Sequence, residues 1–367
     1  MDPIISDISH DGDKYKFTLG NVNVSYVNAI RRTVLTDIPV IGIYTETYKD
    51  NQCVIEKNTT RLHNEIIKQR LSCIPIHMKN LEDLPGKYEL VVDMKNETDT
   101  NIIITTEDFK IRSKASENYL KEEVVHQIFP KNDKTGMYID FARLRARIDE
   151  NMIPGEELKL VADFSIQTAS QNSMYNVASI CSYGNTIDMV KVNSVWEQQE
   201  KKLVADNLSS DEIKIQKKNY YILDSQRQYK ENSFDFVIQS VGIYTNEELI
   251  KKSCKLLINQ FTELITIIDG EDLRINNNET TMDNSYDIII EEGGYTIGNI
   301  LDYMLYEALY KKNILTFCGF KKFHPHDDYA TLRLSFKKVV TKREIEEYLK
   351  KVCGEIIQKF EKILKLF

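Results

Sequence analysis

Two stretches of the sequence predict long amphipathic helices whose apolar sides are too wide to face water. A Thr precedes each helix, and a Glu lies three residues after that Thr, which is the spacing of a capping box. The two pairs are Thr245 with Glu248 and Thr341 with Glu344. The apolar stripe of the first helix comprises Leu249, Cys254, Leu257, Ile258, Phe261, Leu264 and Ile265. The stripe of the second comprises Ile345, Leu349, Val352, Ile356, Phe360 and Ile363. Helices with such stripes must pack against a partner.

The segments that precede these two helices follow a common order. Residues 14–27 alternate between polar and apolar and predict a strand or hairpin, residues 25–37 predict a helix closed by Pro39, and a strand follows. Near the C-terminus, "YDIIIEE" predicts a strand, "YTIGNILDYMLYEALY" a helix, and "ILTFCGFKKFHPHDDYATLRLSF" a strand, a loop and a strand. The repeated order of strand, helix, strand and long helix indicates two related halves joined as a covalent heterodimer.

The first copy of this pattern carries an insertion. Residues 59–76 predict a second helix, closed by Pro75. From residue 86 to 195, strand-like runs alternate with turn signals, which predicts an inserted β-rich domain. Residues 196–232 are polar and charged, hold the only tryptophan, and predict a surface helix with a connector.

We therefore expect an α+β fold, in which two dimerisation domains pair within one chain and the first carries the β-rich insertion. The expected divisions follow in chain order. They are the first part of the larger dimerisation domain (1–80), the inserted domain (81–195), the connector and second part (196–268), a linker (269–284) and the smaller dimerisation domain (285–367).

Composition narrows the class of protein. The 367 residues carry a net charge of −8, with a pI near 5.5, which argues against a free-standing nucleic-acid-binding protein. The six cysteines are scattered without a CxxC pair, so we expect reduced thiols in an intracellular protein and neither a zinc site nor a redox motif. The N-terminal residues do not resemble a signal peptide, and no apolar run is long enough to predict a membrane span.

Two motifs leave a choice between a functional and a packing role. The glycine run "EEGGYTIGNI", residues 291–300, could cradle a phosphate, but it lacks the P-loop Lys and has two flanking glutamates, so a tight strand-to-helix turn is favoured. The run "HPHDD", residues 324–328, could contribute metal ligands, but the sequence has no second His cluster, so loop packing is favoured.

A third motif is the pair Arg31 and Arg32, which lies within an otherwise apolar helix. Guanidinium groups form bidentate contacts with carboxylates and are weakly hydrated, which suits them to protein interfaces. The alternative is that both arginines extend along an exposed helix edge. The sequence alone favours neither.

Three stretches together resemble a known family. "NAIRRTVLTDIPVIGIYT" followed by "RLHNEIIKQRLSCIPI" is similar to the signature of the α-type subunits of multisubunit RNA polymerases. These include the bacterial α subunit, its larger archaeal counterpart and the third-largest subunit of eukaryotic RNA polymerase II. "PGEELKLVADFSIQTASQNSMYNVAS" resembles the end of their inserted domain. The C-terminal "YTIGNILDYMLYEALYKKNILTFCGFKKFHPHDDYATLRLSF" resembles their small partner, which is the eleventh subunit in RNA polymerase II and a small α-like subunit in archaea.

The resemblance covers most of the chain and is weakest at residues 100–145 and 196–232. It implies a fusion of the larger and smaller α-type subunits that serves transcription as a non-catalytic assembly platform, with the catalytic site on the two largest subunits. The implied partners are the second-largest and largest subunits and the small assembly subunits. Contact with DNA and RNA would occur only through the whole enzyme, and neither a homodimer nor membrane binding is expected. Fused forms occur in large DNA viruses, which implies a viral protein in the cytoplasm or nucleus of an infected host, or in the virus particle.

The resemblance also implies site residues. Arg31 and Arg32 would contact a large subunit, which favours the interface interpretation given above. No catalytic, cofactor or metal residues are implied, because the cysteine cluster that some larger partners carry is absent and Cys181 stands alone in the inserted domain. The expected pseudo-dimer interface comprises Ile30, Val34, Leu35, Leu257, Phe261, Leu264, Ile300, Leu301, Leu305, Leu349, Val352, Ile356 and Phe360.

Two other functions stay open at this stage. The chain could be a scaffold of a non-polymerase complex that reuses this fold. It could also be an enzyme in its own right, with an active site in the 86–195 domain, although no nucleophile elbow or catalytic triad order is visible in the sequence.

Overall fold

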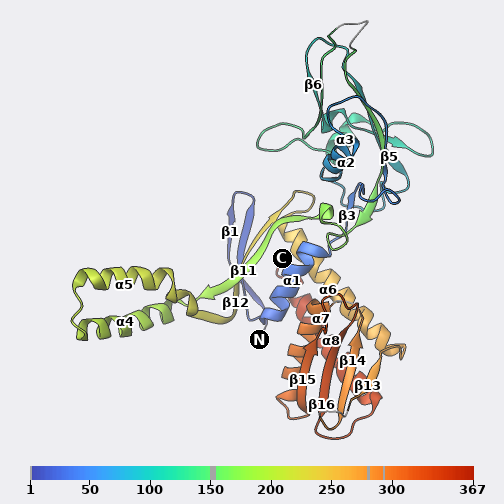
Figure 1. Cartoon of the computed structure of the whole chain (residues 1–367). Coiled ribbons are helices and arrows are strands. Elements are labelled where there is room, and N and C mark those ends of the chain that lie inside the picture. The colour runs from blue at the N-terminus through green and yellow to red at the C-terminus, as the bar shows by residue number, and fades with distance from the viewer. Residues whose placement is uncertain (1, 149–153, 279–281, 292–293) are drawn as a thin grey trace. The chain divides into compact units, whose positions relative to one another are not determined.

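The computed structural model describes residues 2–148, 154–278, 282–291 and 294–367. The chain forms two compact units. Unit 1 comprises Met1–Val34, Ile180–Gln239 and Asn246–Phe367, and unit 2 comprises Leu35–Ser179 and Ser240–Thr245. Helices and strands are mixed throughout (Figure 1), which confirms the expected α+β class.

The first half of unit 1 is built on a four-stranded sheet in the order β1-β2-β12-β11. Its strands are β1 (Ile4–Asp11), β2 (Lys14–Gly20), β11 (Ala178–Ile187) and β12 (Tyr229–Ser240). Its two helices are α1 (Val24–Thr36), which confirms the helix predicted over 25–37, and α6 (Asn246–Asp269).

The second half of unit 1 has a four-stranded sheet in the order β13-β14-β16-β15. Its strands are β13 (Ile275–Asn277), β14 (Ser285–Ile290), β15 (Leu315–Lys321) and β16 (Ala330–Phe336). Its helices are α7 (Gly294–Leu305), extended by the π-helical turn η4 (Tyr306–Tyr310), and α8 (Lys342–Leu364). The strands and helices of the second half follow one another in the same order as those of the first half. The repeat expected from the sequence is therefore also a repeat of topology.

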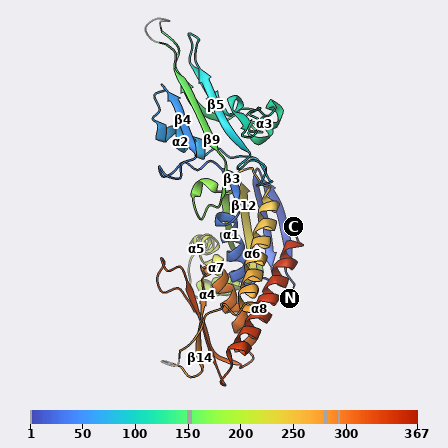
Figure 2. The same ribbon diagram turned by 90° about the vertical axis from the view of Figure 1, so that its right-hand side faces the viewer.

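Long helices α6 and α8 lie side by side in unit 1 (Figure 2). The predicted capping box of α8 is confirmed, because Thr341 Oγ1 accepts from the Glu344 backbone N–H and the Glu344 carboxylate accepts from the Thr341 N–H. The corresponding box at Thr245 and Glu248 stays a prediction. The segment 269–284, expected as a linker, contains the short strand β13 and the buried Leu273, so it joins the second sheet.

Most of segment 196–232 belongs to a helical hairpin, and its last residues begin strand β12. The helices of the hairpin are α4 (Met189–Ala205) and α5 (Ser210–Ile222), followed by the 3-10 turn η3 (Asp224–Arg227). Trp196 is buried in the hairpin against Val192 and Tyr220, so it is not part of an exposed connector. The hairpin occupies the β11–β12 connection, which in the second half is the short β15–β16 loop.

No helix in the described ranges has the length and apolar content to cross a membrane.

Unit 2 contains most of the predicted insertion and is rich in strands. A four-stranded sheet runs in the order β4-β9-β5-β7, and two pairs, β6–β8 and β10–β3, accompany it. The strands are β3 (Val40–Gly42), β4 (Cys53–Asn58), β5 (Tyr88–Lys95), β6 (Ile102–Thr105), β7 (Lys110–Ser113), β8 (Asp140–Leu144), β9 (Glu157–Asp163) and β10 (Ser165–Gln167). The helical segments are α2 (Asn64–Ser72), η1 (Thr106–Asp108), α3 (Glu122–Ile128) and η2 (Ser173–Tyr175).

Helix α2 is shorter than the helix predicted over 59–76. Its predicted first turn is held in a loop by local side-chain bonds, because Asn58 Oδ1 accepts from the Thr60 N–H and Asn58 Nδ2 donates to the Leu62 carbonyl. Asn and Thr side chains that bond to nearby backbone compete in this way with helix formation.

Candidate functional site

Helix α1 carries the two arginines that the sequence singles out. Its buried residues are Tyr26, Val27, Ala29, Ile30, Thr33 and Val34. Arg31 is partly buried, and its Nε donates to Asn28 Oδ1 at 3.0 Å. Arg32 is exposed, and its Nε donates to Thr296 Oγ1 at 3.0 Å. Because Thr296 belongs to α7, Arg32 already links the first half to the second.

Arg31 lies near Cys181 of β11. Burial raises the pKa of the Cys181 thiol to about 12, while the positive charge of Arg31 acts in the opposite direction. Burial likewise raises the pKa of Cys254 and of Cys353 to about 12. These thiols are therefore protonated and unreactive at neutral pH, as expected for packing residues.

The second half has the same arrangement with the opposite charge. Helix α7 aligns with α1 when Asn299 is matched to Asn28, and this alignment places Asp302 at the position of Arg31. Cys318 of β15 contacts Asp302, with Sγ 3.2 Å from Asp302 Oδ1, as Cys181 of β11 lies near Arg31. The two halves thus present a cationic and an anionic side chain at equivalent positions.

Aromatic rings join the two halves at the centre of unit 1. Tyr26 of α1 packs against Phe360 of α8, with ring centroids 5.1 Å apart, and edge-on against Tyr303 of α7 at 6.5 Å. Phe261 of α6 stacks with Phe360 at 6.3 Å. Sequence reasoning missed Tyr26 and Tyr303, although Tyr26 precedes Ile30 by one helical turn and so lies on the predicted apolar side.

The residues expected at the pseudo-dimer interface are buried with two exceptions. Leu35 is partly exposed and belongs to unit 2, and Leu264 is partly exposed beside a cavity. The buried members are Ile30, Val34, Leu257, Phe261, Ile300, Leu301, Leu305, Leu349, Val352, Ile356 and Phe360. They come from α1, α6, α7 and α8, so helices of both halves contribute to the core.

The glycine run lies at the start of α7. Glu292 and Gly293 lie outside the described residues, whereas Gly294 has a φ of +45°, which favours glycine. Gly298 has a packing role that the sequence did not reveal. A Cβ added there would come 1.9 Å from Phe320 Cε2, so the glycine allows α7 to lie directly on β15.

The "HPHDD" run forms a self-bonded loop. The Asp327 carboxylate accepts from the His324 N–H at 2.9 Å, and His324 Nδ1 accepts from the His326 N–H at 3.1 Å. In the described part of the chain, no group of three or more His, Cys, Asp or Glu side chains is placed to hold a metal ion.

Comparison with known families adds to this geometry. The family model described as "RNA polymerase Rpb3/Rpb11 dimerisation domain" matches residues 16–261. That range contains most of the first half of unit 1 together with the β-rich insertion, and it ends within α6.

Individual relatives carry related names. The DNA-directed RNA polymerase subunit Rpo3 of Methanosphaera stadtmanae is 21% identical over 289 residues, which cover 71% of this chain and 97% of that protein. The DNA-directed RNA polymerases IV and V subunit 3B of Arabidopsis thaliana is 28% identical over 167 residues, or 41% of this chain and 46% of that protein. The Rpo3 subunit of Pyrococcus furiosus is 38% identical over 64 residues, or 17% of this chain and 22% of that protein.

The family match and the fold agree, because the matched range begins within β2, contains α1, β11 and β12, and ends within α6, and each of these elements has a counterpart in the second half. The chain belongs to the RNA polymerase Rpb3/Rpb11 dimerisation domain family.

Proposed function

We propose that this chain is a non-catalytic assembly-platform subunit of a multisubunit DNA-directed RNA polymerase, with both α-like partners on one polypeptide. The observation that carries the proposal is the repeated topology. The sheets β1-β2-β12-β11 and β13-β14-β16-β15 have the same strand order, and each is accompanied by one short and one long helix. The second half, from residue 271 onward, lies outside the family match, so the repeat is what supports its assignment as the smaller α-like partner.

Packing supports an internal dimer over a homodimer. Each half directs a Phe of its long helix, Phe261 or Phe360, to the centre of unit 1, where the rings stack and are inaccessible to solvent. The apolar stripes that would pair two separate chains are therefore already satisfied within one chain. We infer that further partners attach through the outer surface of this unit.

Arg31 and Arg32 are our candidates for contacting a large polymerase subunit. Arg31 is oriented by Asn28 and Arg32 by Thr296, and an oriented guanidinium loses less conformational entropy on binding a carboxylate. The names of the relatives, all subunits of DNA-directed RNA polymerases, make the second-largest and largest subunits of such an enzyme the partners to test.

The test is purification of the tagged chain from its native source, followed by identification and quantification of the proteins bound to it. We expect two very large subunits in equal amounts, with RNA synthesis in the eluate. Recovery of the chain alone would contradict the proposal, and recovery with unrelated proteins would favour the scaffold of a non-polymerase complex.

A double variant tests the arginines. Arg31→Ala with Arg32→Ala should leave the chain folded by circular dichroism but weaken capture of the second-largest subunit by about 30-fold, the effect of losing about 2 kcal/mol at an interface hot spot. The matched control is Lys311→Ala with Lys312→Ala, which removes an adjacent basic pair from the second half and should bind as the wild type does. Equal capture by both variants would exclude the arginines from the interface.

A further inference from the structure

The two long helices correspond residue by residue. Aligning Cys254 of α6 with Cys353 of α8, each of which is completely buried, matches the pattern of buried positions along both helices. The other buried pairs brought together are Ile250 with Leu349, Ser253 with Val352, Leu257 with Ile356, and Phe261 with Phe360. The same alignment places Gln260 at the position of Lys359, and Glu263 at the position of Lys362.

In the first half, the segment before strand β1 docks on the end of the opposite long helix. Lys362 Nζ of α8 forms an ion pair with Asp2 Oδ1 at 2.7 Å, and Lys359 Nζ donates to the Asn21 carbonyl at 3.2 Å. Pro3, between Asp2 and strand β1, is buried. Lys362 thus holds the acidic residue of this segment directly. Lys359 instead holds the turn after β2, where Asn21 Nδ2 donates to the Asp2 carbonyl.

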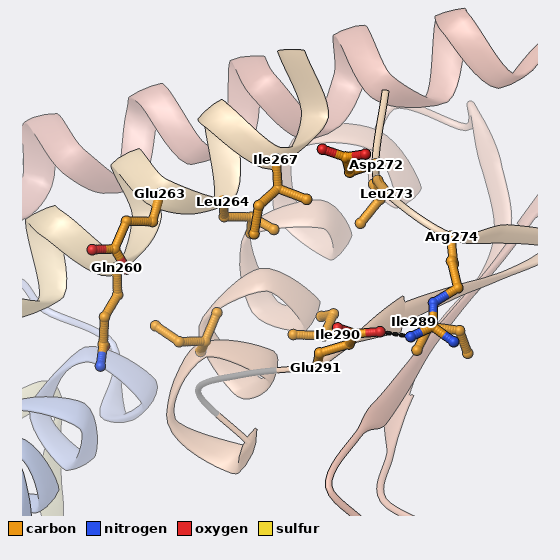
Figure 3. Close-up of a pocket in the computed structure, with 11 residues that line it drawn as sticks. Gln260, Glu263, Leu264, Ile267, Asp272, Leu273, Arg274, Ile289, Ile290 and Glu291 are labelled. Atoms are coloured by element: carbon orange, nitrogen blue, oxygen red, sulfur yellow. Dashed lines mark ion pairs between the residues drawn. The ribbon is translucent and has the colours of Figure 1, made fainter. Parts of the chain in front are cut away.

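In the second half, the segment before β13 and the end of α6 line one cavity. Asp272 of this segment and Glu263 of α6 are both acidic, so the ion pair that ties Asp2 to Lys362 has no counterpart here. The cavity has a volume of about 260 Å³ and lies between the end of α6, this segment, the end of β14 and the start of α7 (Figure 3).

The cavity has an apolar lining and an open side. The apolar lining residues are Leu264, Ile267, Leu273, Ile289, Ile290 and Ile297. Ile267 is 44% exposed, so the cavity opens to solvent at this residue. An apolar side chain can therefore enter from solvent and be covered by these residues.

The polar lining of this cavity favours a positively charged occupant. Glu263 and Asp272 contribute two carboxylates. Arg274, the single cation among the described lining residues, already forms an ion pair with Glu291 (Figure 3). Gln260 Oε1 is buried and accepts no hydrogen bond from the described residues. A buried acceptor without a donor is destabilising, and a donor from a bound segment would relieve that.

We propose that this cavity is a docking groove for an extended segment of a partner protein in which a Lys or Arg precedes a small apolar side chain. Asp272 cannot form an ion pair with Glu263, because both residues are acidic, and the bound segment supplies that ion pair instead. Its cation pairs with Glu263, an N–H group donates to Gln260 Oε1, and the apolar side chain packs between Ile267 and Ile297. Glu263 of α6 stands at the position of Lys362 of α8. The first half therefore holds an acidic segment, whereas the second half accepts a basic one.

Two peptides built from this chain test the proposal. Acetyl-Lys-Pro-Ile-Ile-Ser-Asp-amide copies residues 2–7 with Asp2→Lys, and the control peptide keeps the Asp. The whole chain, labelled at Ile and Leu methyl groups, is titrated with each peptide at millimolar concentration and followed by NMR. We expect the Lys peptide to shift the Leu264, Ile267 and Ile289 methyl signals and to bind about fivefold more tightly than the Asp peptide, the effect of one partly screened ion pair.

Variants determine whether the preference comes from the groove. Glu263→Lys should reverse the preference between the two peptides, whereas Glu361→Lys, the same charge change on an exposed part of α8, should leave it unaltered. The proposal is overturned if neither peptide shifts the three methyl signals, if both bind equally, or if Glu361→Lys reverses the preference as Glu263→Lys does.

Discussion

At the scale of single residues, Gly298 makes the sharpest prediction for stability. Because a Cβ at this position would overlap the ring of Phe320, Gly298→Ala should destabilise the chain by about 2–3 kcal/mol, the upper range for overpacking a core. Urea unfolding followed by circular dichroism measures this. Adding Phe320→Leu should restore part of the loss, because the smaller side chain makes room for the methyl group.

Gly354 is the matched control within another helix. A Cβ there meets no atom within 4 Å, so Gly354→Ala should stabilise α8 by about 0.5–1 kcal/mol through helix propensity alone. The two Gly→Ala changes are thus expected to have opposite signs. Equal effects would mean that the contact between α7 and β15 is looser than the structure indicates.

Residue-level features are predictable from the sequence where they depend on local spacing. The capping box at Thr341 and the buried stripe of α8 follow from helical periodicity. The position of Gly298 under Phe320, and the reciprocal placement of Arg31 and Asp302, depend on how helices lie on sheets. No local pattern contains that information, so only the three-dimensional structure could reveal them.

At the scale of elements, the α4–α5 hairpin should unfold independently of the rest of unit 1. Its core is small. The ring centroids of Trp196 and Tyr220 lie 5.5 Å apart, and the Tyr220 hydroxyl donates to the Val192 carbonyl. Small clusters of this kind open at low free energy. Since Trp196 is the only tryptophan, its fluorescence reports on the hairpin alone, and its urea midpoint should lie below that of the far-ultraviolet circular dichroism.

A variant separates this result from an effect of the probe. Trp196→Phe should weaken the hairpin while leaving the main circular dichroism transition in place. Coincident fluorescence and circular dichroism midpoints in the wild type would instead mean that the hairpin and the sheets unfold as one cooperative unit.

Elements are predictable in proportion to their own periodicity. Helices α1, α6, α7 and α8 have apolar stripes that reveal them in the sequence. The edge strands β1 and β13 have no such pattern. Strand β13 lies in a polar segment of linker-like composition, and β1 is mostly exposed. Such strands form because a neighbouring strand offers hydrogen-bonding partners, and the composition of the edge strand itself does not reveal that neighbour.

At the scale of the whole molecule, the chain should survive division between its halves. Fragments 1–270 and 271–367, expressed together, should copurify in equal amounts, because Phe261 and Phe360 are buried against each other across the division. Each fragment expressed alone should aggregate, since its long helix would expose an apolar stripe. Size-exclusion chromatography with light scattering measures both outcomes.

The control for division is a charged residue in the core. Phe360→Asp in the smaller fragment should abolish copurification, because it places a carboxylate among aromatic rings. Two fragments that are each soluble and monomeric would contradict an obligate internal dimer.

The exchange of Arg31 for Asp302 at equivalent positions has an evolutionary consequence. In a dimer of identical chains, every substitution appears on both faces at once. A change that strengthens binding at one face can therefore weaken binding at the other. When both halves are encoded in one reading frame as separate sequences, each face accumulates mutations on its own. The difference between the two faces is then inherited with the polypeptide and does not depend on which two subunits associate.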